Sequence, residues 1–156
     1  MRLYLVRHGD ALTGDLDPAR PLSDEGRQQV AVLASFLAGQ GLAVARVYHS
    51  GKLRARQTAE ALVAAVAPGA TPDELAGLNP NDPVEDLLPR LSDWTDDSLI
   101  AGHLPHLSNL ATRLLAGRAV PAGMRFEASA AACLQRDGEG GWSLLWFVDP
   151  QLLPRP

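Results

Sequence analysis

The sequence predicts an α/β protein, a three-layer α/β/α sandwich with a mostly parallel sheet. Short apolar runs alternate along the chain with longer segments whose apolar residues recur every three or four positions, which is typical of strands that alternate with helices. Glycine and proline residues separate many of these segments and favour turns there. The chain has 156 residues, of which 46% are hydrophobic, so we expect a single domain over residues 1–156.

The first half of the chain predicts two strands and two helices. Residues 3–6 form an apolar run that ends in polar residues, which indicates a buried parallel strand. A helix is predicted to begin at Ser23, because serine caps helices and acidic residues follow it, and to end near Gly39. Residues 44–48 give the second strand, and the periodicity of 52–67 gives the second helix.

The second half completes the sheet. Residues 72–89 hold several prolines and turn formers, so we expect mostly loop there, with a short helix near 84–91. Residues 98–102 are the third predicted strand, and the helix after it has Pro105 in its first turn and ends at Gly117. Two further strands are joined by a glycine-rich turn, at 130–136 and 142–148.

Composition excludes several classes of function. The formal charge is −4, which disfavours a general nucleic-acid binder because such proteins carry a basic face. Cys133 is the only cysteine and lies in an apolar run, so we expect a buried thiol, no disulfide and a reducing compartment. The apolar stretch before Arg7 is too short for a signal peptide or a membrane span. We therefore expect a cytoplasmic protein that binds neither membrane nor nucleic acid.

Arginine and histidine residues follow the predicted strands. Arg7 and His8 end the first strand, His103 follows the third, and Arg54 lies in the first turn of the second helix. Ligands of such sheets bind at the carboxyl ends of the strands. A neutral imidazole can attack phosphorus. An arginine side chain stays charged and can donate two parallel hydrogen bonds to two phosphoryl oxygens. The arginines would also keep His8 neutral by charge repulsion.

Three ordered blocks carry a resemblance to a known family. The first is Arg7-His8-Gly9, which is followed by Pro21-Leu22-Ser23 with Gly26 and Gln29; the second runs over 50–59 and holds Arg54 and Thr58; the third is Gly102-His103-Leu104-Pro105. The chain resembles the histidine phosphatase, or phosphoglycerate-mutase-like, superfamily, and most of all its compact SixA-type phosphohistidine phosphatases. It departs from the family pattern at Gly51, where proline is usual, and at His49, where a small polar residue is common.

The resemblance implies a phosphoglycerate-mutase-like fold and a role for each of these residues. His8 would be the nucleophile that becomes phosphorylated, Arg7 and Arg54 would clamp the phosphoryl oxygens, and His103 would donate a further hydrogen bond. Arg20 resembles an additional arginine at the rim of the site. No metal and no cofactor are expected, since the histidines lack ligand spacing and the arginines would repel a cation.

The general acid is less clearly marked in the sequence. Ester-cleaving members of the superfamily use a carboxylate from the segment after the second helix. Asp82 is the candidate there, although its context, Asn79-Pro80-Asn81-Asp82, is typical of turns. Imidazole is a better leaving group than an alkoxide and needs less help from an acid. The chain between the Arg54 helix and the His103 strand is also too short for a large helical insertion, so a histidine displayed on a protein could enter the site.

These observations lead to one expected function and two alternatives. We expect a phosphohistidine phosphatase that acts on a phosphohistidine-bearing domain of a signalling or phosphotransfer protein through phospho-His8. The first alternative is a small-molecule phosphomonoesterase of the same superfamily, which would need a carboxylate near His8. The second is a catalytically silent phosphoprotein-binding module, because the same arginines could bind a ground state.

Overall fold

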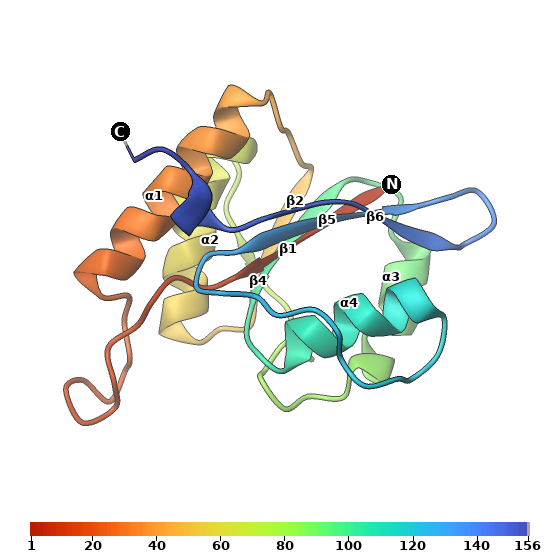
Figure 1. The fold of residues 1–156 in the computed structure, drawn as a ribbon, viewed down its shortest axis with the longest axis horizontal. Helices are drawn as coiled ribbons and strands as arrows, with labels where there is room; N and C mark the ends of the chain where they lie inside the picture. The colour runs from red at the N-terminus through yellow and green to blue at the C-terminus, as the bar shows by residue number, and fades with distance from the viewer. Residues whose placement is uncertain (156) are drawn as a thin grey trace.

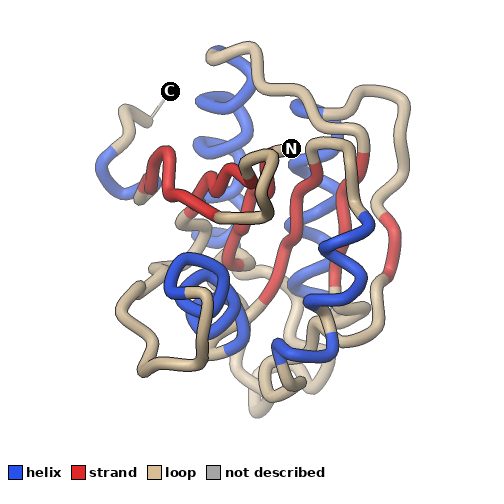
Figure 2. The backbone as a smooth tube through the Cα atoms, turned by 90° about the vertical axis from the view of Figure 1, so that its right-hand side faces the viewer, coloured by secondary structure: helices blue, strands red, loops and turns tan. Residues whose placement is uncertain are grey.

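The computed structural model describes residues 1–155 and shows a six-stranded sheet with helices on both faces (Figures 1 and 2). The strand order is β3-β2-β4-β1-β5-β6. The strands are β1 Arg2–Arg7, β2 Arg46–His49, β3 Asp73–Glu74, β4 Ser98–Gly102, β5 Ala131–Arg136 and β6 Trp142–Val148. Strands β1 to β4 pair in parallel, whereas β5 and β6 add antiparallel strands beside β1. The predicted mostly parallel sheet is confirmed.

Two helices cover each face of the sheet. The helices are α1 Asp24–Gly39, α2 Leu53–Val66, α3 Leu88–Asp93 and α4 His106–Ala116, with 3-10 turns at Val84–Asp86 and Pro150–Leu152. Helices α1 and α2 lie together on one side, and α3 and α4 lie on the other (Figure 1). The described chain between α2 and β4 holds only β3, a 3-10 turn and the six-residue α3. The predicted sandwich without a large insertion is therefore confirmed.

The core lies on both sides of β1. Tyr4 and Val6 belong to the apolar cluster under α1 and α2, while Leu3 and Leu5 belong to the cluster under α3 and α4. Successive side chains of a strand point to opposite faces, so a strand that is buried on both faces needs an unbroken apolar run. This double burial explains the apolar run at the start of the sequence.

Local signals account for the helix boundaries. The Ser23 side chain accepts the Gly26 amide at 3.0 Å and caps α1, as predicted. Gly117 ends α4 with φ +69, a left-handed conformation that glycine adopts without a Cβ penalty. Pro105 is the residue before α4 rather than part of its first turn, because its carbonyl accepts the Asn109 amide as a capping residue does.

Two strand boundaries differ from the sequence prediction. Residues 73 and 74, expected in a loop, form β3 and pair with β2. Strand β2 begins at Arg46 rather than at 44, because the amides of Val44 and Ala45 bond to the carbonyls of Val66 and Asp97 instead. Among the helices of residues 1–155, none is long and apolar enough to cross a membrane.

Candidate active site

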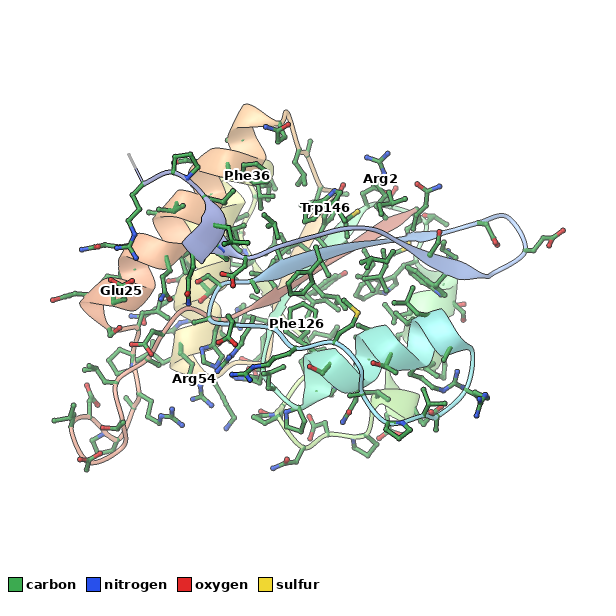
Figure 3. The ribbon with its side chains drawn as sticks, viewed as in Figure 1. Arg2, Glu25, Phe36, Arg54, Phe126 and Trp146 are labelled. Atoms are coloured by element: carbon green, nitrogen blue, oxygen red, sulfur yellow. The ribbon has the colours of Figure 1, made fainter. Side chains whose placement is uncertain are left out.

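The parallel strands deliver the candidate residues to one edge of the sheet. Arg7, the last residue of β1, pairs with Gly102, the last residue of β4. His8 and His103 therefore follow neighbouring strand ends, and their ring centroids lie 5.0 Å apart. Helix α2 begins four residues after β2 and presents Arg54 in its first turn (Figure 3). The Nε atom of Arg54 lies 3.3 Å from Nε2 of His8.

The His8 ring is held in one tautomer. Its Nδ1 lies 2.7 Å from the Gly9 carbonyl oxygen. A carbonyl can only accept a hydrogen bond, so Nδ1 carries the proton and Nε2 keeps its lone pair. Burial lowers the pKa of His8 to about 4, and the guanidinium groups of Arg54, Arg7 and Arg20 act in the same direction, while the Gly9 hydrogen bond opposes them. At neutral pH the ring is a neutral base.

His103 is more deeply buried than His8. Its Nε2 lies 2.6 Å from the Ser50 hydroxyl, which also accepts the Lys52 amide at 3.3 Å. Burial lowers the pKa of His103 to about 3, and the nearby His8 and Arg54 add to this effect. Its Nδ1 is buried and has no hydrogen-bond partner among residues 1–155. Sequence reasoning did not single out Ser50, although this residue stands in the same block as Arg54.

The segment that precedes β5 contacts Arg7 and the backbone of His8. One of its terminal nitrogens donates to the Phe126 carbonyl at 2.8 Å, and its Nε is buried without a partner in the described chain. Ser129, three residues later, donates its amide to the His8 carbonyl at 3.3 Å. Ser129 has φ +61 and is fully buried. A left-handed conformation costs a non-glycine residue about 1–2 kcal/mol, and such strain persists where surrounding contacts enforce it.

Arg20 and Asp82 differ in their relation to this cluster. Arg20 is exposed, with φ +51, and its Nε donates to the Leu12 carbonyl at 3.1 Å. Its charge contributes to the lowered pKa values of His8 and Arg54, so it lies at the rim of the cluster. Asp82 instead accepts the Asn79 amide at 2.8 Å within a turn. No hydrogen bond or ion pair in residues 1–155 joins Asp82 to the cluster.

The remaining motif residues hold the loop that carries Arg20. Gln57 accepts the Leu22 amide at 2.8 Å, and Gln29 accepts the Asp10 amide at 3.2 Å. A Cβ at Gly26 would lie 1.9 Å from the Asp10 carbonyl oxygen. The loop therefore packs directly on the start of α1 and can do so only because residue 26 is glycine.

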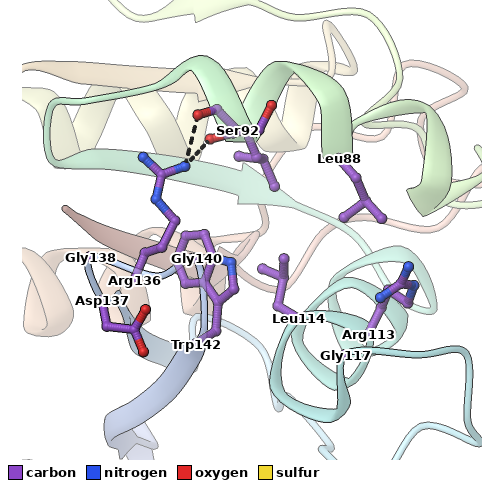
Figure 4. Close-up of a pocket in the computed structure, with 11 residues that line it drawn as sticks. Leu88, Ser92, Arg113, Leu114, Gly117, Arg136, Asp137, Gly138, Gly140 and Trp142 are labelled. Carbon is purple, nitrogen blue, oxygen red and sulfur yellow. Dashed lines mark hydrogen bonds between the residues drawn. The ribbon is translucent and has the colours of Figure 1, made fainter.

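A cavity lies away from the candidate residues. A cavity of about 660 Å³ lies between α3, α4 and the β5–β6 turn (Figure 4), and none of the candidate residues lines it. Its two arginines are already paired: Arg136 donates to carbonyls at the end of α3, and Arg113 pairs with Glu85 at 2.7 Å. Across the described chain there is also no group of three or more acidic, histidine or cysteine side chains that could hold a metal ion.

In residues 1–155 the cluster combines a neutral histidine with arginines that pair with no carboxylate, a chemistry that suits a phosphoryl group. Comparisons with known proteins identify the family. The family model of the histidine phosphatase superfamily (branch 1) matches residues 3–79. The phosphohistidine phosphatase SixA of Escherichia coli (strain K12) is 30% identical over 155 residues, which cover 96% of this chain and 94% of that protein. The chain therefore belongs to the histidine phosphatase superfamily, and it is a hydrolase that acts on phosphoryl groups.

Solved structures show the same fold. A structure of the protein histidine phosphatase SixA complexed with tungstate has a TM-score of 0.84 and 29% identity, and the match covers 97% of this chain and 98% of that chain. The α-ribazole phosphatase of Shigella flexneri has a TM-score of 0.78 at 19% identity, over 96% of this chain and 97% of that chain. At this identity the second similarity concerns the fold alone.

Proposed function

We propose that the protein is a phosphohistidine phosphatase, which hydrolyses phosphohistidine on a signalling or phosphotransfer protein in the cytoplasm, with residues 1–156 working as one domain. One observation carries the proposal: the His8 ring is neutral near neutral pH and has its lone pair on Nε2, the nitrogen that lies beside Arg54. The similarity to SixA over nearly the whole chain supports the substrate class.

The proposed reaction proceeds in two displacements at phosphorus. Nε2 of His8 attacks, a P–N bond to His8 forms, and the P–N bond of the substrate breaks as its imidazole leaves with the electron pair and takes up a proton from solvent water. Water then attacks phospho-His8, so inorganic phosphate leaves and the His8 ring is free again. No metal ion is needed, because arginines neutralise the charge of the phosphoryl oxygens.

Each of the other residues has a proposed role that its contacts support. Arg54 reaches the attacking nitrogen, so its guanidinium lies where the oxygens of an incoming phosphoryl group would be. Arg7 has a buried Nε that pairs with no group of residues 1–155 and can donate to the same oxygens. If Ser50 donates to Nε2 of His103, then Nδ1 of His103 carries the proton and becomes a further donor. Arg20 would contact the substrate at the rim.

The missing acid favours a P–N bond over an ester. In residues 1–155 no carboxylate makes a hydrogen bond or ion pair with Arg7, Arg54 or either histidine of the site, and Asp82 serves a turn. An alkoxide leaving group needs a proton from such a group, whereas imidazole needs little help. Neutral His8 also supports a chemical role over a silent binding module, because binding alone requires no basic nitrogen. Within residues 1–155 the Nε2 lone pair accepts only from Arg54 Nε, which a bound phosphoryl oxygen would draw away.

The choice of bond can be tested on one enzyme preparation. We expect kcat/KM to be highest for a phosphohistidine protein, lower for an aryl phosphate and lowest for a sugar phosphate, because the leaving groups need progressively more protonation. The Asp82→Asn variant should keep its activity on phosphohistidine within about twofold, since Asp82 has only a turn contact. A sugar phosphate as the best substrate, with a large loss in Asp82→Asn, would instead indicate a phosphomonoesterase.

The charge state of His8 gives a second test. Since its pKa is lowered to about 4, the His8 ring should stay neutral on acidification until well below the usual histidine value of about 6.5. Between these two pH values the unfolded chain binds more protons than the folded one, so folding stability should fall as the pH falls through this window. Ring ¹⁵N shifts, assigned with a His8→Asn variant, measure the midpoint. A midpoint near the usual value would contradict the proposed state of the nucleophile.

A further inference from the structure

Thr58 connects Arg54 to the residue that follows His8. It lies one helical turn after Arg54 on α2 and is fully buried. Its hydroxyl donates to the Arg54 carbonyl oxygen at 2.8 Å. The same hydroxyl accepts the Gly9 amide at 3.1 Å, so one oxygen joins the helix of Arg54 to the residue that follows His8.

These contacts belong to a closed ring of hydrogen bonds. The Gly9 amide bonds to Thr58, and the Gly9 carbonyl accepts Nδ1–H of His8 at 2.7 Å. The contact between Nε of Arg54 and Nε2 of His8, at 3.3 Å, completes this cycle of hydrogen bonds. Among the three side chains that form this cycle of hydrogen bonds, only Thr58 has no proposed contact with the phosphoryl group.

The two bonds of the Thr58 hydroxyl differ in what they imply. Donation to the carbonyl four residues earlier is ordinary for threonine in a helix. Acceptance of the Gly9 amide is specific to this fold, because Gly9 and Thr58 are 49 residues apart. The Gly9 backbone is also tightly enclosed, since a Cβ there would lie 2.7 Å from the Gly26 carbonyl oxygen. Thr58 is the hydrogen-bond acceptor of the Gly9 amide in the described chain, and a buried amide left unpaired is costly.

We propose that Thr58 is a positioning residue, which sets the His8 ring against Arg54 and favours the Nδ1–H tautomer. By holding the His8–Gly9 peptide through the Gly9 amide, it fixes the backbone at Gly9 and with it the direction of the Gly9 carbonyl in the next peptide unit. The inference rests on the proposed role of His8 as nucleophile. Without the hydroxyl, the Gly9 amide loses its partner, so the His8–Gly9 peptide tilts and the Gly9 carbonyl, in the next peptide unit, loses alignment with Nδ1. When the ring also turns away from Arg54 Nε, which donates to Nε2, the proton can move to Nε2, and this removes the attacking lone pair.

The test compares three substitutions in the full chain. Thr58→Val has nearly the same shape but lacks the hydroxyl, so we expect kcat on a phosphohistidine protein to fall by about tenfold or more, with KM within about twofold, since misplacement acts on the chemical step. Thr58→Ser restores the hydroxyl and should recover most of the activity. Thr112→Val is the matched control, because the Thr112 hydroxyl on α4 also accepts a glycine amide, that of Gly123 at 3.3 Å, and its loss should leave kcat unchanged.

Ring ¹⁵N shifts of His8 give a readout that a merely structural role would not move. In the wild type Nδ1 should be protonated and Nε2 bare, whereas Thr58→Val should show a substantial share of the other tautomer. Kinetics and spectra are recorded where circular dichroism shows each variant fully folded. If Thr58→Val does not fold, hydrogen exchange of the Gly9 amide in the wild type decides: strong protection supports the bond to Thr58, and exchange at the rate of an exposed amide overturns it.

The outcomes separate this inference from the proposed function. An unchanged kcat and an unchanged His8 tautomer in Thr58→Val, in a protein that His8→Ala inactivates, would overturn the role of Thr58 alone. A rise in KM without a change in kcat, or a Thr58→Ser variant as impaired as Thr58→Val, would also overturn it. Full turnover by His8→Ala would instead reject the proposed function itself.

Discussion

Replacement of His8 by alanine is expected to lower turnover by at least about four decades, because removal of a catalytic nucleophile typically has an effect of this size or larger. The covalent route through His8 Nε2 disappears, and no other imidazole replaces it, since His103 is held by Ser50. The fold should survive, because the His8 side chain donates only to the carbonyl of the next residue.

Rapid quenching under alkaline conditions and mass spectrometry provide the matching measurement. Wild-type enzyme mixed with a phosphohistidine protein should carry a phosphoryl group on the peptide that contains His8, and the His8→Ala protein should carry none. Circular dichroism and thermal unfolding show whether the variant is folded. Turnover close to the wild-type rate in a folded His8→Ala protein would exclude the covalent mechanism.

The sequence predicted the layers of the fold well because their signals are local. The apolar run of β1 and the cap at Ser23 need only their neighbours in the chain to be recognised. Strand β3 has no such signal: Asp73 and Glu74 are charged, and only their pairing with Tyr48 and His49 makes them a strand. Such non-local pairing overrides local preference and is invisible to a periodicity argument.

In the candidate site, too, local sequence signals could be recognised and non-local contacts could not. Arg7, His8, Arg54 and His103 could be named because each follows a predicted strand or opens a helix, and parallel strands bring those positions to one edge. Their supporting partners could not be named in this way. Phe126 lies 119 residues from Arg7 and contributes only its backbone carbonyl, so its side-chain chemistry carries no signal for the contact. The roles of Thr58 and Ser50 likewise depend on distances that spacing in the sequence cannot give.

Replacement of Arg54 by alanine is expected to lower kcat/KM by about two decades or more, because removal of one donor from a site that stabilises developing charge has this effect. Arg54 is half-buried, and burial lowers its pKa, with Arg20 adding to the effect. The Arg54 side chain makes no ion pair with a carboxylate among residues 1–155, so its charge is available to a phosphoryl group.

Arg56, on the same turn of α2, is the matched control for Arg54. It is exposed and pairs with Glu60 at 3.5 Å, a surface contact of the kind that contributes about 0.3–0.5 kcal/mol to a helix. Arg56→Ala should therefore keep kcat/KM within about twofold, since a solvated side chain contributes little at the site. Arg54→Lys should recover only part of the loss, because an ammonium group cannot bind two phosphoryl oxygens as the planar guanidinium does. If Arg54→Ala behaves like Arg56→Ala, the arginine clamp is assigned to the wrong residue of this helix, and the approach of Arg54 to His8 Nε2 at 3.3 Å has no part in catalysis.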